Sequence, residues 1–507
     1  MKKLAVVIAG LLVLAGCSSV EPETVSYPVQ TEENVQNSEQ PKPTPEVTET
    51  ESESVDAPIV REEEEVVQED VQVSEPRKTE TALPEPSEAP TVNAPIVEDV
   101  YELSYEIIED DVCKLREVSA PRARWADVPA SAFPLNTYGK TISSFGTTNV
   151  QVIYLEWEDL RGTQADYNYH VKELDIARNF LKVVSEGNFN LNPIHAPEWS
   201  LVEGSYKDFY TSDEYADATN KSQAHLQFLV DSFIEATDST VDYTDVDVLF
   251  FAFPREEMVV QGNGMHIFGK GGLVTANTNE GTVVDIFSLG SRVYDHAYGN
   301  PGWSSFVHEF SHSLNMPDLR DWSDGKDQLR GDDFKLYLVN PMYGLDIMDV
   351  QGTGTQGLSG WMKWLQGWLD NSQVTCIDAA TVDSEYYRLD QSNLMNADNE
   401  MLVVRLSETK ALAIESRRWD SRFDLPVQNS RDGVIVYVVD ATRGHAEGPL
   451  KLLSPRDVTK YLSQDGVWPD WRMLDVILFE GDSITYEGVT ITAEHSEENG
   501  DIVLVSR

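Results

Sequence analysis

The chain has 507 residues and a net charge of −49, from 87 acidic and 38 basic side chains. A negative field of this strength repels nucleic-acid phosphates, so nucleic acid is excluded as an expected partner. Acidity of this kind bears on solubility and gives no information about mechanism.

The first 17 residues, MKKLAVVIAGLLVLAGC, place two lysines before an apolar stretch that ends at Cys17. The stretch is shorter than the roughly 20 residues that cross a bilayer, which indicates a secretory signal. Its final cysteine makes it resemble a bacterial lipoprotein signal with Cys17 as the lipidated residue; a plain secreted signal is the alternative. The resemblance implies a lipid-anchored envelope protein, and Ser18 favours the outer membrane, on its periplasmic or surface face.

Residues 18–100 are rich in Glu, Pro, Thr, Ser and Val, with no aromatic residue from position 28 onward. Such a composition buries too little apolar surface to offset chain entropy. We therefore expect a disordered acidic linker that holds the rest of the chain away from the membrane.

Residues 101–370 have the patterns of a first folded domain. Strand-like runs lie at Asn149–Trp157 and from Val246 onward, and helical periodicity covers His170–Glu186 and Ala216–Ala236. A Gly-interrupted strand from His266 is expected at the edge of the sheet, beside a cleft. The alternation of strands and helices favours a layered α/β or α+β domain.

Residues 371–507 change to short strands separated by turns, which is typical of a mainly β domain of sandwich type. The segments expected to be strands are EYYRLD, EMLVVRLS, KALAIES, DGVIVYVVD, DVILFEG, ITYEGVTITAEH and DIVLVSR.

Three cysteines are present, and lipidation of Cys17 leaves Cys113 and Cys376. In an oxidising compartment these two either form a disulfide or lie apart as buried thiols.

The segment WSSFVHEFSHSLNMPDLRDW, from Trp303, carries the chemistry. His308 and His312 are four residues apart and so project from one side of a helix, where both imidazoles reach one metal ion. Glu309 lies near the same side and is placed to act as general base toward a water molecule. The alternative is a partly exposed helix with two hydrogen-bonded histidines.

The third metal ligand is expected to be Asp318. After Glu309 the next glutamate is Glu385, and after His312 the next histidine is His445, both far along the chain. Asp318 lies six residues after His312, at the last ligand position of the pattern HExxHxxGxxH/D.

This geometry requires the chain to reverse after the helix. Asn315 takes the position where a left-handed glycine is usual, and Pro317 prevents the helix from resuming. Asp321 is the fallback ligand, although its spacing is less suitable.

HEFSHSLNMPDLRD, from His308, resembles the HExxHxxGLPDxYD signature of the immune inhibitor A-like metalloproteases, a bacterial metzincin family. LDIMDVQGTGTQGLSGWMKWLQGWL, from Leu345, is similar to that family's second block. The resemblance implies a metzincin-like catalytic domain with a mixed sheet and an active-site helix. It also implies Zn²⁺ as cofactor and Met348 as the methionine of the turn beneath the metal.

Several acidic side chains follow the site, and their oxygens are of the type that Ca²⁺ prefers; a solvated acidic loop is the alternative. They are Asp321, Asp324, Asp327, Asp332 and Asp333.

The sequence thus predicts a monomeric zinc endopeptidase that hydrolyses proteins or peptides outside the cytoplasm. Zinc would activate water, and Glu309 would accept and return its proton. One alternative is a lipid-anchored adhesive or binding protein with a non-catalytic fold of the same type. Another is a zinc hydrolase that cleaves a non-peptide amide or ester.

Overall fold

The computed structural model describes residues 101, 110–115, 132–133, 142–206, 223–255, 265–269, 274–289, 302–321, 341–349, 357–392, 394, 397–419, 423, 432–456 and 476–507. The predicted signal, Cys17 and acidic linker lie outside these residues. Pro90–Arg507 belong to one compact unit. Among the described residues, no helix combines the length and apolar character needed to span a bilayer.

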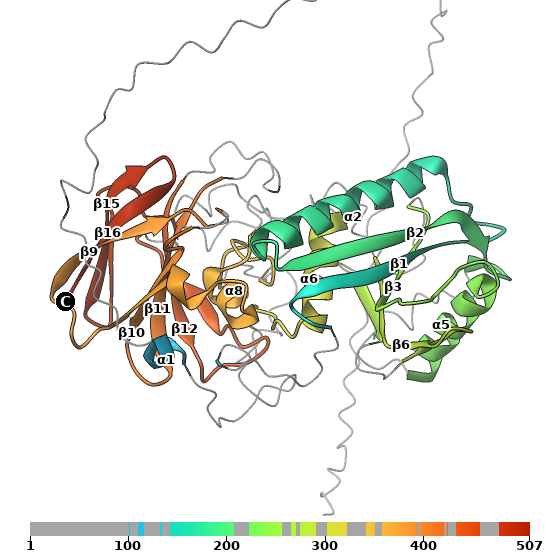
Figure 1. Cartoon of the computed structure of the whole chain (residues 1–507), viewed down its shortest axis with the longest axis horizontal. Helices are drawn as coiled ribbons and strands as arrows, with labels where there is room; N and C mark the ends of the chain where they lie inside the picture. Colours follow the sequence, from blue (N-terminus) through green and yellow to red (C-terminus); the bar gives the residue numbers. More distant parts are fainter. Residues whose placement is uncertain are drawn as a thin grey trace, which may run out of the picture. The chain divides into compact units, whose positions relative to one another are not determined.

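The fold is a mixture of helices and several sheets in which strands predominate (Figure 1). From edge to edge, the strands of the first sheet are β2 (Phe189–Leu201), β1 (Gly146–Glu156), β3 (Val248–Ala252), β7 (Asp285–Leu289) and β4 (Met265–Gly269). The first four are parallel, and β4 pairs antiparallel with β7. The expected strands at β1 and β3 are confirmed, and β4 is the expected edge strand.

Helices cover both faces of this sheet. They are α2 (Gln164–Val184), α5 (Gln223–Thr237) and α6 (Gly302–Ser313). Alternate residues of β1 point to opposite sides: Val150 and Val152 join a core with α2 and α6, whereas Ile153 and Leu155 join a core with α5. Figure 1 shows α2 lying along β2 and β1. The predicted helices correspond to α2 and α5, although residues 216–222 of the second prediction lie outside the described residues. A small ribbon of β5 (Ala276–Asn277) and β6 (Thr282–Val283) lies against α5.

Two further sheets are formed by the C-terminal residues. The five-stranded sheet has the order β13 (Leu450–Leu452), β12 (Gly433–Asp440), β11 (Lys410–Arg417), β10 (Met401–Arg405) and β8 (Val374–Asp378). The four-stranded sheet has the order β14 (Ser483–Tyr486), β15 (Val489–Glu497), β16 (Gly500–Ser506) and β9 (Ser384–Asp390). Six of the seven expected segments contain strands of these sheets, and ITYEGVTITAEH forms the hairpin of β14 and β15, whereas β8 and β13 lie outside every expected segment.

The prediction of a strand in DVILFEG is wrong. Of its described residues, 476–481, only Leu478 makes a bridge, with Val434, through the two backbone hydrogen bonds between these residues. The neighbouring Val476 and Ile477 are buried in the core without forming a ladder. A short apolar run that is buried on all sides has no alternation, so its composition alone does not distinguish a strand from a packed loop.

The five-stranded sheet is buried on both faces. Leu402 and Val404 of β10 face the four-stranded sheet, whereas Met401 and Val403 face the core that contains α6 and α8 (Gly360–Gln366). Burial on both faces explains why the sequences of these strands are continuous apolar runs and do not alternate. One hydrophobic core therefore extends across residue 370, where the sequence predicts a domain boundary.

A disulfide bond joins Cys113 of α1 (Asp110–Cys113) to Cys376 of β8, with the two Cα atoms 5.8 Å apart. Of the two alternatives that the sequence left open, the structure has the bonded one. Between α8 and β8 lies the 3₁₀ turn η5 (Asn371–Gln373).

Candidate metal centre

Helix α6 carries three side chains with metal-ligating atoms. The ligating atoms of His308, Glu309 and His312 all lie within 4.8 Å of one another, with both imidazoles buried and Glu309 partly exposed. The helix is fixed at its start because the Trp303 amide donates a hydrogen bond to Glu173 Oε2 of α2 at 2.9 Å. A carboxylate at this end satisfies a backbone donor that the helix leaves unpaired.

The helix ends in the reversal that the sequence predicts. Asn315 has a φ of 67°, in the left-handed region. The Met316 amide donates to the Ser311 carbonyl at 3.1 Å and the Asn315 amide to the His312 carbonyl at 2.9 Å. This pair of bonds is the Schellman arrangement, which turns the chain back over the last turn of the helix.

Both imidazoles are oriented by backbone carbonyl groups. Nδ1 of His308 lies 2.7 Å from the Ile347 carbonyl oxygen, and Nδ1 of His312 lies 2.8 Å from the Met316 carbonyl oxygen. Each Nδ1 must carry the proton to donate these bonds, so each neutral ring presents the lone pair of Nε2 to the site. Such bonds to the outer ring nitrogen fix the tautomer of metal-binding histidines.

The reversal brings Asp318 to the same point. Its Oδ1 lies 3.0 Å from His308 Nε2 and 3.7 Å from His312 Nε2. Zinc with ligands at about 2.0–2.1 Å in a tetrahedron separates those ligands by about 3.3 Å, which fits these distances. Asp318 Oδ1 is buried and accepts no hydrogen bond of good geometry. Asp318 Oδ1 therefore lies close to both Nε2 atoms, and a cation among the three atoms would satisfy all of them.

The electrostatics of the cluster agree with a site for a cation. Burial raises the pKa of the Asp318 carboxyl, but the contact with His308 and the charge of His312 outweigh it and hold that pKa well below its usual range. Burial of His308 opposes its protonation, yet contact with Asp318 raises its pKa overall. A carboxylate that stays charged beside two imidazoles favours a positive charge between them.

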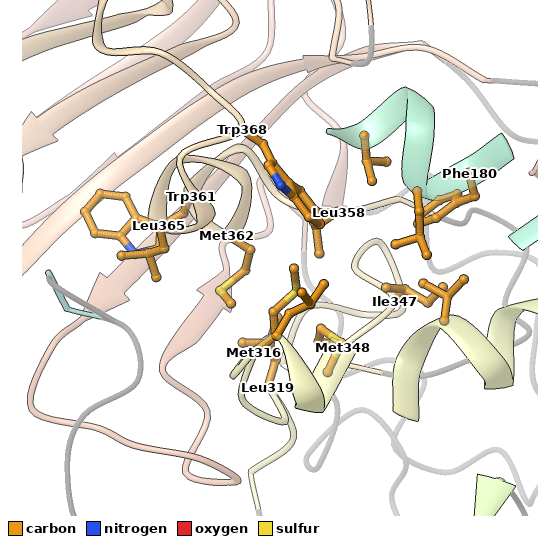
Figure 2. Packing of buried hydrophobic residues seen from close by; sticks show 14 of the residues in the cluster. Phe180, Met316, Leu319, Ile347, Met348, Leu358, Trp361, Met362, Leu365 and Trp368 are labelled. Atoms are coloured by element: carbon orange, nitrogen blue, oxygen red, sulfur yellow. The ribbon is translucent and has the colours of Figure 1, made fainter. Parts of the chain in front are cut away.

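Met348, predicted for the turn beneath the metal, is fully buried next to the reversal. Its carbonyl oxygen accepts the Leu319 amide at 3.0 Å, and the preceding Ile347 carbonyl is the one that orients His308. The Asp346 carboxylate stabilises this turn by accepting hydrogen bonds from the amides of Met348 and Ser359, each at 2.8 Å. Figure 2 shows Met316, Leu319 and Met348 next to one another.

One residue of the site was missed from the sequence. His445 lies in the connection between β12 and β13. Its Nδ1 accepts a hydrogen bond from the Asp318 amide at 3.0 Å, and its Nε2 lies 3.5 Å from Asp318 Oδ2. Its ring stands edge-on to that of His312, with ring centroids 5.7 Å apart. The sequence set His445 aside because of its distance along the chain, and no pattern around it indicates a role.

The fallback ligand Asp321 lies away from this cluster. Its Oδ2 is 3.8 Å from Arg443 Nη1, and its backbone forms a bridge with Glu447. The other acidic residues considered for calcium lie outside the described residues: Asp324, Asp327, Asp332 and Asp333.

The chain matches none of the protein-family models with which it was compared, and no curated protein matches it significantly. The resemblance to the immune inhibitor A-like metalloproteases therefore depends on the two blocks around His308 and Met348.

Proposed function

We propose that this chain is a zinc-dependent endopeptidase of the metzincin type. The observation that supports it most directly is the convergence of His308 Nε2, His312 Nε2 and Asp318 Oδ1, with Asp318 Oδ1 3.0 Å and 3.7 Å from the two nitrogens. Two imidazoles and one carboxylate are a ligand set that zinc hydrolases use, and three protein ligands leave a position open.

Bound zinc would act as a Lewis acid that polarises a substrate carbonyl and lowers the pKa of water. Glu309 follows the first histidine, is partly exposed and lies within reach of the same point. In the proposed reaction its carboxylate accepts a proton from the attacking water and returns it to the amine that leaves.

Strand β4 supports an extended peptide as the substrate. Among the described strands it is at the edge of the first sheet, antiparallel to β7, and it contacts α6. An edge strand has unpaired backbone groups on its outer side, and these bind an extended chain through main-chain hydrogen bonds. We therefore place the substrate along β4, with its scissile bond at the end nearest the histidines.

Metal analysis combined with a Glu309→Ala variant tests the proposal. The purified protein should contain one zinc per chain and cleave a denatured protein substrate, and the variant should keep the zinc while losing cleavage by at least about 100-fold. Cleavage that survives in the variant, or a folded protein that does not bind zinc, would refute the mechanism. Mass spectrometry of the products separates peptide hydrolysis from cleavage of another amide or an ester.

A further inference from the structure

The connection between β12 and β13, residues 441–449, holds Asp318 by its backbone on both sides. The Asp318 amide donates to His445 Nδ1 at 3.0 Å, and the Asp318 carbonyl accepts the Ala446 amide at 2.9 Å. The pairing continues along the chain, since the Gly448 amide donates to the Arg320 carbonyl at 3.0 Å. The chain after α6 is therefore hydrogen-bonded at Asp318 and Arg320 to a segment more than 120 positions away.

The two segments are also in close contact. Gly448 has a φ of +65°, and a Cβ atom there would lie 3.1 Å from Asp321 Cβ. A glycine fits this position because it tolerates the left-handed region and leaves room for the Asp321 side chain.

The hydrogen bond at Nδ1 determines the tautomer of His445. Because Nδ1 accepts the Asp318 amide, the neutral ring carries its proton on Nε2, and Nε2 lies 3.5 Å from Asp318 Oδ2. A protonated Nε2 has no lone pair for a metal, so this histidine is not a ligand in this arrangement. Its Nε2 instead lies beside the outer oxygen of the carboxylate, while Oδ1 lies near His308 and His312.

We propose that His445 is a positioning residue for Asp318, and that residues 441–449 thereby form part of the metal centre. The inference rests on the zinc site proposed above. His445 fixes the backbone of Asp318 through Nδ1 and directs its carboxylate through Nε2. A hydrogen-bond partner of a metal ligand typically contributes 10- to 100-fold in metal affinity.

Zinc affinity, measured by competition with a chelator, is the test. Three variants separate the two contacts: His445→Ala removes both, His445→Asn keeps an acceptor for the Asp318 amide, and His445→Gln keeps a donor near the carboxylate. We expect His445→Ala to bind zinc about 10- to 100-fold more weakly, with Asn or Gln restoring part of the loss. His495→Gln, a histidine change in β15 of the four-stranded sheet, is the matched control and should leave the affinity unchanged.

Cobalt substitution gives a second measurement that does not depend on activity. The visible d–d absorption of bound Co²⁺ should shift in His445→Ala, because the carboxylate is no longer held in one orientation. Wild-type zinc affinity and an unchanged cobalt spectrum in His445→Ala would overturn the inference while leaving the zinc site intact. A wild-type chain that binds no zinc would overturn the proposed function and this inference with it. If His445→Ala fails to fold, the same comparison is made between His445→Asn and the wild type.

Discussion

His308 Nε2 lies 3.0 Å from Asp318 Oδ1, while His308 Nδ1 lies 2.7 Å from the Ile347 carbonyl oxygen. The ring therefore has a fixed outer hydrogen bond and an inner nitrogen aimed at a carboxylate. Without a metal, both contacts are satisfied when His308 is a charged imidazolium, a form that burial opposes and that the contact with Asp318 favours overall. A cation between the nitrogen and the oxygen satisfies the neutral ring.

Asp318→Ala should reduce zinc affinity by more than about 100-fold, because it removes a ligand and not merely the partner of one. The measurement is chelator competition, with circular dichroism to confirm that the variant is folded. Asp321→Ala is the matched control, since it removes a nearby carboxylate whose Oδ2 lies 3.8 Å from Arg443 Nη1. Equal losses in the two variants would contradict the assignment of Asp318 as the third ligand.

Asn315→Gly should stabilise the protein by about 0.5–1 kcal/mol, and Asn315→Ala should destabilise it by about 1 kcal/mol. The reason is the φ of 67° at this position, which glycine adopts without steric cost. Glycine also removes a buried side-chain amide nitrogen that has no hydrogen-bond partner. Urea unfolding with all three proteins checks the order, and an alanine variant as stable as the glycine variant would show that the turn carries no strain.

The reversal at Asn315 could be predicted from the sequence because its causes are local. A histidine pair at helical spacing, a residue that tolerates the left-handed region and Pro317 lie within ten positions of one another. The backbone bonds of the turn join Ser311 and His312 to residues at most five positions away. Local hydrogen bonds and steric limits fix such a feature, so no knowledge of the distant chain is required.

Strand β2 and His445 could not be predicted in the same way. β2 contains Pro193 and Pro197 and many polar residues, and it becomes a strand by parallel pairing with β1. His445 lies 127 positions from Asp318, and tertiary packing alone brings the two together. Neither feature has a periodicity or a motif, because the partner that stabilises it is far away in the sequence.

Lowering the pH should destabilise the protein through His170. Burial lowers the pKa of His170 to about 4 from its ordinary value of 6.5, and its Nε2 lies 3.0 Å from the Phe253 carbonyl oxygen. Below pH 6.5 the unfolded chain takes up a proton at His170 that the folded chain excludes. The contribution of His170 to the free energy of unfolding is therefore complete above pH 6.5. It falls by about 1.4 kcal/mol per pH unit until about pH 4, a total of about 3 kcal/mol.

The measurement for His170 is the free energy of unfolding in urea at several values between pH 7 and pH 4. Carboxylates titrate in the same range, so the slope of the unfolding free energy against pH is compared between the wild type and His170→Gln. The slope of the variant should be shallower by about 1.4 kcal/mol per pH unit. His495→Gln, at a partly exposed position, controls for the loss of a histidine as such. Identical slopes for the wild type and His170→Gln would show that His170 is protonated in the folded protein.

Lys363 and Glu400 form a buried ion pair between α8 and the start of β10, and each side chain is 1% exposed. Burial raises the pKa of Glu400, although the charge of Lys363 acts in the opposite direction. Lys363→Met should cost about 3–5 kcal/mol, because it leaves a carboxylate buried without its partner. The double variant Lys363→Met/Glu400→Leu removes both charges and should recover most of that loss, since the desolvation of a buried pair offsets much of its attraction. Urea unfolding of the single and double variants measures the coupling, and a double variant less stable than Lys363→Met would show that the pair itself is strongly stabilising.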